Sequence, residues 1–184
     1  MDATLKEILK NRAIEIHEPF AEYLEASQDE VNFSIRLIDV VRLAGHTCRA
    51  VSSAYLLVEY AKKNLFPSQP LIRGLLKVRI SGDGPHGSLG PISQVISYIT
   101  GAWGVTGFPG FEGGRFSRKN LLTYDPQLPA SYYEFERIDT GQKLRLRIKH
   151  ENVPAALEGE RFQSVWRKQV LYMLENSVQL VESL

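Results

Sequence analysis

Residues 132–149 read YYEFERIDTGQKLRLRIK, and this stretch indicates the type of fold more clearly than any other part of the chain. Aromatic and apolar side chains alternate with charged ones over 132–138 and again over 143–149, which is the period of a half-buried strand. Between them, Asp139-Thr140-Gly141-Gln142 has the composition of a hairpin turn. The sequence therefore predicts an antiparallel β-hairpin here.

Further strands and helices are expected on the N-terminal side of this hairpin. Residues 120–124 and 71–80 read as strands, and apolar side chains at helical spacing predict helices over 47–64 and 92–102. Residues 32–43 fit either a helix or a strand, because periodicity cannot separate the two over so short a run.

Both ends of the chain are expected to be helical. One helix is predicted over 3–27, kinked near Glu18 by Pro19, and another over 154–183. Terminal helices around a contiguous set of strands predict an α+β fold with a mixed or antiparallel sheet core and flanking helices. We expect a single domain over 1–184, with a core at about 40–150 and helical extensions at 1–30 and 154–184.

Composition excludes several classes of protein. The 184 residues are 43% hydrophobic and 23% charged, which is ordinary for a globular domain and excludes wholesale disorder. The net charge of +1 gives no strong attraction to nucleic acid or anionic lipid, so neither partner is expected. One cysteine cannot form an intramolecular disulfide, and no run approaches the ~18 apolar residues of a membrane span. A cytoplasmic protein is expected.

The first stretch that could carry chemistry is Gly45-His46-Thr47-Cys48. Two residues turn a helix by about 200°, so His46 and Cys48 can meet at one atom only where the backbone is extended or turning. Gly45 permits such a turn, and the positive end of the following helix dipole favours a thiolate at Cys48. Imidazole and thiolate together suit zinc or a similar transition metal. The alternative is a buried structural cysteine.

Two further loops are candidates. The stretch 83–88, DGPHGS, follows a strand and precedes a helix, so His86 is either a ligand or acid–base group or a solvated loop residue. Before the strand at 120–124, Arg118 is one of three cations, and it would either be solvated or bind an anion at the lip of a pocket. His17 and His150 have no companions in sequence and are expected to be structural or at the surface.

Taken in order, these stretches resemble the FmdE family, which is named after one component of formylmethanofuran dehydrogenase. The matching stretches cover about 40–150 and are Gly45-His46-Thr47-Cys48, Gln94 in the second helix, Phe116-Ser117-Arg118-Lys119-Asn120-Leu121, Tyr133-Glu134-Phe135-Glu136-Arg137 and Thr140-Gly141. The resemblance implies a mixed-sheet α+β core, an intertwined homodimer and a metal held by His46 and Cys48. It also points to Gln94 and Arg118 as residues that bind a cofactor or ligand.

The chain departs from this pattern in two places. Family members usually carry a further cysteine and an aspartate before the second helix, where this chain has Ser88 and Pro91 nearby and His86 two residues before Ser88. Either His86 replaces the missing ligand, or the metal site is altered or absent. The cysteine-rich C-terminal zinc module of some members is also missing.

Three functions follow from these observations. The first is a homodimeric metal-binding protein, most simply a zinc protein, with His46, Cys48 and His86 as ligands and a small molecule in the pocket beside them. In it the loops 83–90 and 104–118 wall the pocket. Its apolar lining comes from Trp103, Phe108 and Phe111, unless these aromatic residues pack in the core or form a dimer contact. The second is a non-enzymatic carrier or sensor of haem or a small molecule. The third is a metal-free thiol enzyme that uses Cys48. Whether the protein is an enzyme is left open.

Overall fold

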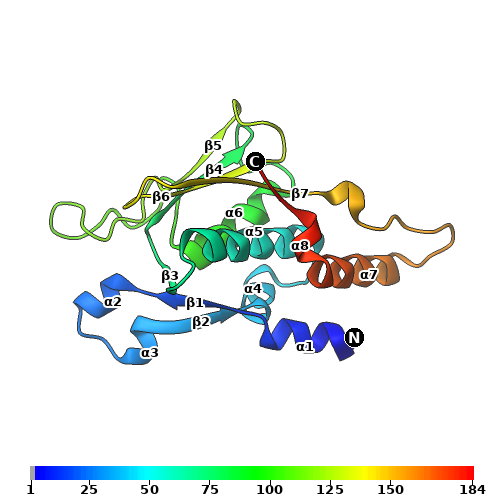
Figure 1. Ribbon diagram of the computed structural model, residues 1–184, viewed down its shortest axis with the longest axis horizontal. Coiled ribbons are helices and arrows are strands. Elements are labelled where there is room, and N and C mark those ends of the chain that lie inside the picture. Colours follow the sequence, from blue (N-terminus) through cyan, green and yellow to red (C-terminus); the bar gives the residue numbers. More distant parts are fainter. Residues whose placement is uncertain (1–2) are drawn as a thin grey trace.

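The computed structural model describes residues 3–184 and shows an α+β fold with two sheets and helices between and around them (Figure 1). The helices are α1 (Ala3–Asn11), α2 (Pro19–Tyr23), α3 (Gln28–Val31), α4 (Leu37–Ala44), α5 (Arg49–Leu65), α6 (Leu89–Thr100), α7 (Phe162–Glu175) and α8 (Ser177–Leu180). A 3₁₀ turn covers His150–Asn152. The strands are β1 (Ala13–His17), β2 (Asn32–Arg36), β3 (Leu71–Ile72), β4 (Leu76–Ser81), β5 (Leu122–Asp125), β6 (Tyr133–Arg137), β7 (Lys143–Ile148) and β8 (Val181–Ser183). The predicted fold class is confirmed.

The larger sheet has the order β5-β4-β6-β7-β8 and is mixed. β4 pairs with β5 in parallel, whereas β4–β6, β6–β7 and β7–β8 are antiparallel. The predicted hairpin is the β6–β7 pair, in which Phe135 lies opposite Leu144. The smaller sheet has the order β2-β1-β3, with β1 antiparallel to β2 and parallel to β3.

Helix α5 lies between the two sheets, above β1 and below the larger sheet in the view of Figure 1. Its residues Val51–Val58 are all buried, because a helix covered on every side has no polar face. A single cluster of buried apolar side chains extends from Leu5 in α1 through α5 to Val181 in β8. None of the helices described is long and apolar enough to cross a bilayer.

The prediction of one kinked helix over 3–27 is wrong. A helix does begin there, but it ends at Asn11, and Ala13–His17 forms β1 instead. Ile14 and Ile16 are buried while their neighbours Ala13 and Glu15 are exposed, which is strand alternation. β1 is stabilised by β2, a partner 15 to 23 residues away in register, so local spacing alone could not show it. The ambiguous segment 32–43 holds a strand followed by a helix, namely β2 and α4.

The prediction of one long C-terminal helix over 154–183 is also wrong. Residues 154–161 are not helical, α7 and α8 are separate, and the chain ends in β8 against β7. The apolar residues Leu157 and Phe162 are 66% and 68% exposed, whereas Val170 and Leu174 on α7 are buried. Ile148 in β7 pairs with Val181 in β8, so residues 181–183 add a strand to the edge of the larger sheet that β7 would otherwise form.

Candidate functional site

The Gly45-His46-Thr47-Cys48 stretch joins α4 to α5, as its sequence predicts. Gly45 ends α4 with φ +78°, a left-handed conformation that glycine adopts without strain. Cys48 is the N-cap of α5, and its Sγ accepts a hydrogen bond from the Val51 N–H at 3.4 Å. The thiol is buried, with Cys48 6% exposed, and it belongs to the apolar core.

His46 lies outside that core and is exposed. Its Nδ1 lies 3.1 Å from the Ala44 carbonyl oxygen, which can only accept a hydrogen bond, so Nδ1 carries the proton and Nε2 presents a lone pair. The ring centroid lies 6.4 Å from that of Trp166, whose indole N–H donates to the Thr47 carbonyl at 2.6 Å. Helix α7 therefore holds the motif in place.

His86 lies on the exposed loop before α6. Its side chain is 78% exposed, and its Nε2 lies 3.7 Å from an Asp83 carboxylate oxygen. Within residues 3–184, no group of three or more His, Cys, Asp or Glu side chains is placed to hold a metal ion. A structural zinc site takes four ligands and a catalytic one takes three from the protein. The donors within residues 3–184 therefore do not make up a complete metal site of either kind.

Arg118 is not where the sequence suggested, whereas Gln94 lies in the second helix as expected. Arg118 is only 8% exposed, and its guanidinium is ion-paired with Glu18, so it is neither solvated nor at the lip of a pocket. Gln94 is exposed on α6. Burial lowers the pKa of Arg118, while Glu18 acts in the opposite direction.

The expected aromatic lining also lies elsewhere. Phe108, Phe111 and Phe116 from the loop before β5 pack on Phe20 and Tyr23 of α2, with ring centroids 5.1 to 6.4 Å apart. Phe108 and Phe111 remain 41% exposed. These five residues form an aromatic patch on the surface rather than the wall of a cavity.

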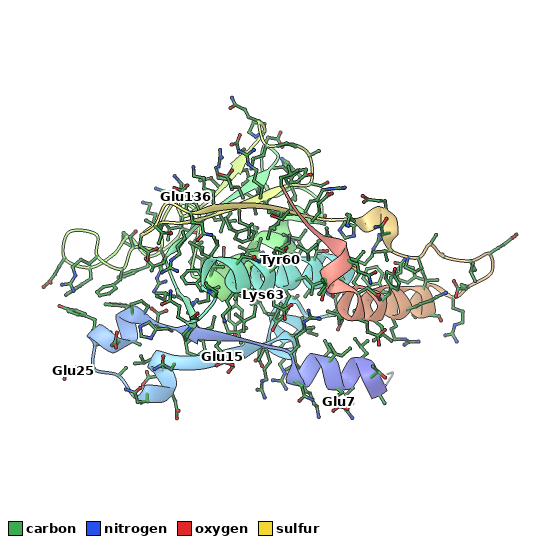
Figure 2. The ribbon with its side chains drawn as sticks, viewed as in Figure 1. Glu7, Glu15, Glu25, Tyr60, Lys63 and Glu136 are labelled. Atoms are coloured by element: carbon green, nitrogen blue, oxygen red, sulfur yellow. The ribbon has the colours of Figure 1, made fainter. Side chains whose placement is uncertain are left out.

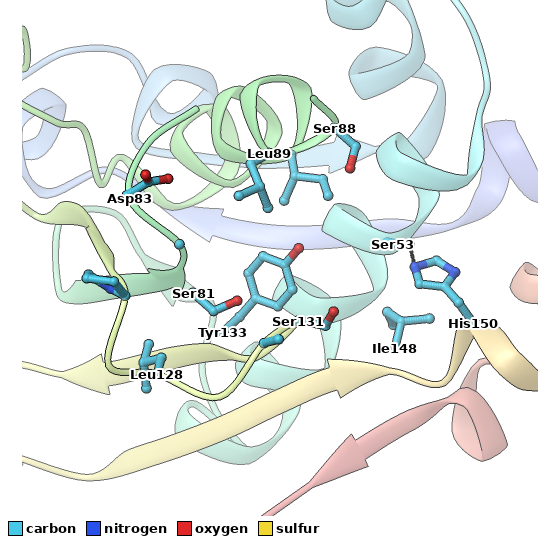
Figure 3. Close-up of a pocket in the computed structure, with 14 residues that line it drawn as sticks. Ser53, Ser81, Asp83, Ser88, Leu89, Leu128, Ser131, Tyr133, Ile148 and His150 are labelled. Atoms are coloured by element: carbon cyan, nitrogen blue, oxygen red, sulfur yellow. Dashed lines mark hydrogen bonds between the residues drawn. The ribbon is translucent and has the colours of Figure 1, made fainter. Parts of the chain in front are cut away.

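A pocket of about 530 Å³ opens where β4 ends and α6 begins (Figure 3). Its lining residues come from α5, the loop 81–89, α6, the segment 126–133 and the end of β7: Ser53, Ser81, Gly82, Asp83, Ser88, Leu89, Ile92, Pro126, Leu128, Ala130, Ser131, Tyr133, Ile148 and His150. The loop 83–90 contributes Asp83, Ser88 and Leu89 to this lining, whereas 104–118 contributes nothing. His46, Cys48 and His86 are not among the lining residues, so this is a different pocket from the one expected beside a metal. A cavity of this volume is in the usual range for small-molecule sites.

Four hydroxyl groups face this pocket without a protein partner. Ser81 and Tyr133 are each 6% exposed, and neither hydroxyl forms a hydrogen bond within residues 3–184; the same holds for Ser88 and Ser131 at the rim. Figure 3 shows the Tyr133 ring projecting from β6 with its oxygen toward α6. Burial, and then Tyr124, raises the pKa of Tyr133 to about 12, so its hydroxyl is protonated at neutral pH. None of these four oxygens is among the fully buried unpaired side-chain atoms of residues 3–184, which are Ser52 Oγ, Arg73 Nε and Arg118 Nη1. The four hydroxyls are therefore open to the pocket and free to hydrogen-bond a molecule bound there.

His150 and Ser53 form a side-chain hydrogen bond across the lining, with His150 Nε2 3.3 Å from Ser53 Oγ (Figure 3). Partial burial lowers the pKa of His150, and Arg49 at the start of α5 lowers it further, while Glu151 opposes them. The imidazole is therefore neutral at pH 7.

Sequence reasoning missed His150, Ser53 and Tyr133. His150 has no other candidate site residue near it in the sequence. Ser53 lies among eight consecutive buried helix residues, where a serine suggests only close packing. Tyr133 was recognised only as a strand residue of the hairpin. Its hydroxyl is a candidate for ligand binding only because it has no hydrogen-bond partner among the described residues, and a sequence pattern cannot show this.

Comparison of the chain with protein-family models, with curated proteins and with solved structures finds no match.

Proposed function

We propose that this protein binds a small molecule in the pocket between α5, α6 and the larger sheet. The observation that carries this proposal is the pair of hydroxyls on Ser81 and Tyr133, two largely buried residues, which line the cavity without a partner among residues 3–184. Each hydroxyl can donate one hydrogen bond and accept others, so together they offer a ligand in the cavity fixed polar contacts. The apolar side chains of Leu89, Ile92 and Ile148 complete a site with a few polar groups on an apolar lining.

The pocket supports binding more directly than catalysis. Ser53 and His150 form a hydroxyl–imidazole pair, but within residues 3–184 no carboxylate hydrogen-bonds the other nitrogen of His150 to orient the ring. Cys48 is buried and its Sγ is engaged as a helix cap, which leaves the thiol enzyme without an accessible nucleophile. We therefore favour a carrier or sensor, acting in the cytoplasm where the lone thiol stays reduced.

The experiment is a thermal-shift screen of small metabolites against the purified protein. A ligand at 100 times its Kd stabilises the folded state by about 2.7 kcal/mol, which is readily measured. Tyr133→Phe should abolish the shift, because it removes one of these hydroxyls and keeps the ring. The matched control is Tyr172→Phe on α7, outside the pocket, which should leave the shift intact. Equal shifts in both variants would place the ligand elsewhere.

A second proposal is that His46 and Cys48 bind a transition metal such as zinc, or serve a haem, with further ligands from a bound molecule or a second copy of the chain. The observation in its favour is the hydrogen bond that His46 Nδ1 donates to the Ala44 carbonyl, which leaves the lone pair of Nε2 available to bind a metal. Metal-binding histidines are commonly oriented in this way.

This second proposal is tested on protein purified without an affinity tag, by elemental analysis and an absorption spectrum. Cys48→Ser and His46→Ala should each lose most of the metal, whereas His17→Ala and His150→Ala should retain it. His86→Ala separates the two roles of that residue: loss of metal makes it a third ligand, and retention makes it a bystander. Full occupancy in both Cys48→Ser and His46→Ala would refute the site.

We also propose that the protein is a homodimer. The supporting observation is the aromatic patch, where Tyr23, Phe108 and Phe111 are each 41% exposed beside Leu24 at 60%. Exposed apolar patches of this kind mark interaction surfaces. Light scattering at micromolar concentration should give twice the chain mass, and Phe108→Ser should shift the mass toward the monomer. A monomeric mass for the wild-type protein would refute the proposal.

A further inference from the structure

We infer that the pocket selects neutral, hydroxyl-rich molecules, such as a sugar, a polyol or a nucleoside, and discriminates against their anionic counterparts. This inference rests on the proposed small-molecule binding at the same pocket. It follows from four properties of the lining: its charges, its backbone donors, its hydroxyls and its apolar wall.

The first property is the charge of the lining residues. No lysine or arginine is among the fourteen of them, and Asp83 supplies a carboxylate at the rim. The Asp83 side chain is 82% exposed and has one nearby partner, His86 at 3.7 Å. The other titratable residues of the lining are Tyr133 and His150, and both are uncharged at neutral pH for the reasons given above. An anion entering the pocket would meet one negative charge in the lining and no lining cation, because Arg49, whose charge acts on His150, is not itself a lining residue.

The second property is the poor supply of backbone donors at the start of α6. A helix N-terminus usually binds anions through its first free N–H groups. Here the Leu89 N–H donates to the His86 carbonyl at 3.0 Å, and Pro91 has no N–H. The Ile92 N–H is bonded within the helix to Ser88 at 3.1 Å. Gly90 therefore offers the one free amide of the first turn, so this helix end is a weak anion site.

The third property is the set of unpartnered hydroxyls. Ser81, Ser88, Ser131 and Tyr133 can each donate one hydrogen bond and accept others, as the hydroxyls of a polyol also do. The hydroxyls of the pocket and those of a polyol can therefore form several hydrogen-bond patterns in which each group both donates and accepts. A carboxylate or phosphate can only accept, so it would use the donors and leave the lone pairs of these oxygens unmatched.

The fourth property is the apolar part of the lining. Leu89, Ile92, Leu128 and Ile148 present aliphatic surface beside the hydroxyls (Figure 3). The C–H faces of a sugar ring or of a nucleoside base can pack on such a surface while the hydroxyls turn to the serines. The volume of about 530 Å³ accommodates a molecule between a monosaccharide and a nucleoside in size.

The test uses pairs of probes that differ in charge: galactose and galacturonate, myo-inositol and inositol 1-phosphate, and adenosine and adenosine 5′-phosphate. Affinity is measured by calorimetry at pH 8 on the full chain, with Tyr133→Phe and Tyr172→Phe in parallel. We expect the neutral member of at least one pair to bind at least tenfold more tightly than its anion. Tyr133→Phe should weaken that binding at least tenfold, and Tyr172→Phe should leave it unchanged.

A further variant tests the electrostatic argument. Asp83→Asn removes the rim charge and keeps the shape, so it should improve binding of the anionic member several-fold more than it changes binding of the neutral member. Tighter binding of the anion by the wild-type protein, still lost in Tyr133→Phe, would overturn this inference and leave the pocket's binding role standing. If no probe binds, or if binding is insensitive to Tyr133→Phe, the inference and the proposed function fail together.

Discussion

Arg118 forms an ion pair with Glu18, a residue 100 positions earlier in the chain. The two side chains are only 10% and 16% exposed, and Arg73 approaches the other oxygen of Glu18 at 3.3 Å. This contact fixes the segment before β5 to the start of α2, and with it the aromatic patch on both. Arg118 is thus a structural residue, and its substitution should affect folding more than ligand binding.

Arg118→Ala should lower the free energy of unfolding by about 3 kcal/mol, because it breaks a buried ion pair. Arg73 remains to compensate Glu18, which keeps the loss at the lower end of the range for such pairs. Urea denaturation measures the change. Lys119→Ala, at the exposed neighbouring position, is the control and should stay within about 0.5 kcal/mol of the wild type. A wild-type value for Arg118→Ala would mean that the pair contributes nothing.

Gly101→Ala should destabilise the protein, and part of the effect should depend on Arg118. Gly101 has φ +71°, and a Cβ there would lie 2.6 Å from Arg118 Nη1. The left-handed backbone alone costs roughly 1–2 kcal/mol for alanine, and the clash adds to it. In an Arg118→Ala background the clash disappears, so a double-mutant cycle should show coupling of at least about 1 kcal/mol. Strict additivity would contradict the packing of Arg118 against Gly101.

His150→Gln should change the pH dependence of stability. Partial burial and Arg49 lower the folded-state pKa of His150, so the unfolded chain takes up the proton first as the pH falls below about 6.5. The stabilisation from this residue is therefore present at pH 7 and is lost as the pH falls through the folded-state pKa. Urea denaturation between pH 5 and 8 should show a steeper acid loss for the wild type than for His150→Gln.

Arg49→Gln serves as the second variant for this prediction. Removing that charge should raise the pKa of His150 toward its ordinary value and reduce the acid loss, while the opposing Glu151 stays in place. Identical pH profiles for the wild type and His150→Gln would show that the histidine does not contribute.

Cys48→Ser should be more stable than Cys48→Ala by about 1 kcal/mol. Cys48 caps α5 by accepting the Val51 N–H, and serine is a preferred N-cap that can replace this hydrogen bond, whereas alanine cannot. Thermal denaturation of the two variants in metal-free buffer measures the difference. Equal stability would show that the sulfur contributes by packing alone.

The sequence by itself determined the elements whose signals are local. The alternation and turn of 132–149 specify β6 and β7, and Gly45 followed by Cys48 marks the end of α4 and the beginning of α5. The strand-to-helix position of 81–89 also indicated where a pocket would open. In each case a short run of residues carries its own geometric preference, so no distant contact is needed to interpret it.

Only the tertiary structure decided what depends on distant partners. Residues 13–17 and 181–183 become strands because β2 and β7 offer open edges, although local spacing favours helices. Arg118 is buried because Glu18 lies beside it, and His150 becomes part of a site because Ser53 and Tyr133 line the same cavity. The assembled fold decides which strands pair, which side chains are buried and which hydroxyls lack a partner. The sequence alone therefore could not predict these features. Figure 2 shows how side chains from elements far apart in the sequence fill the space between the two sheets.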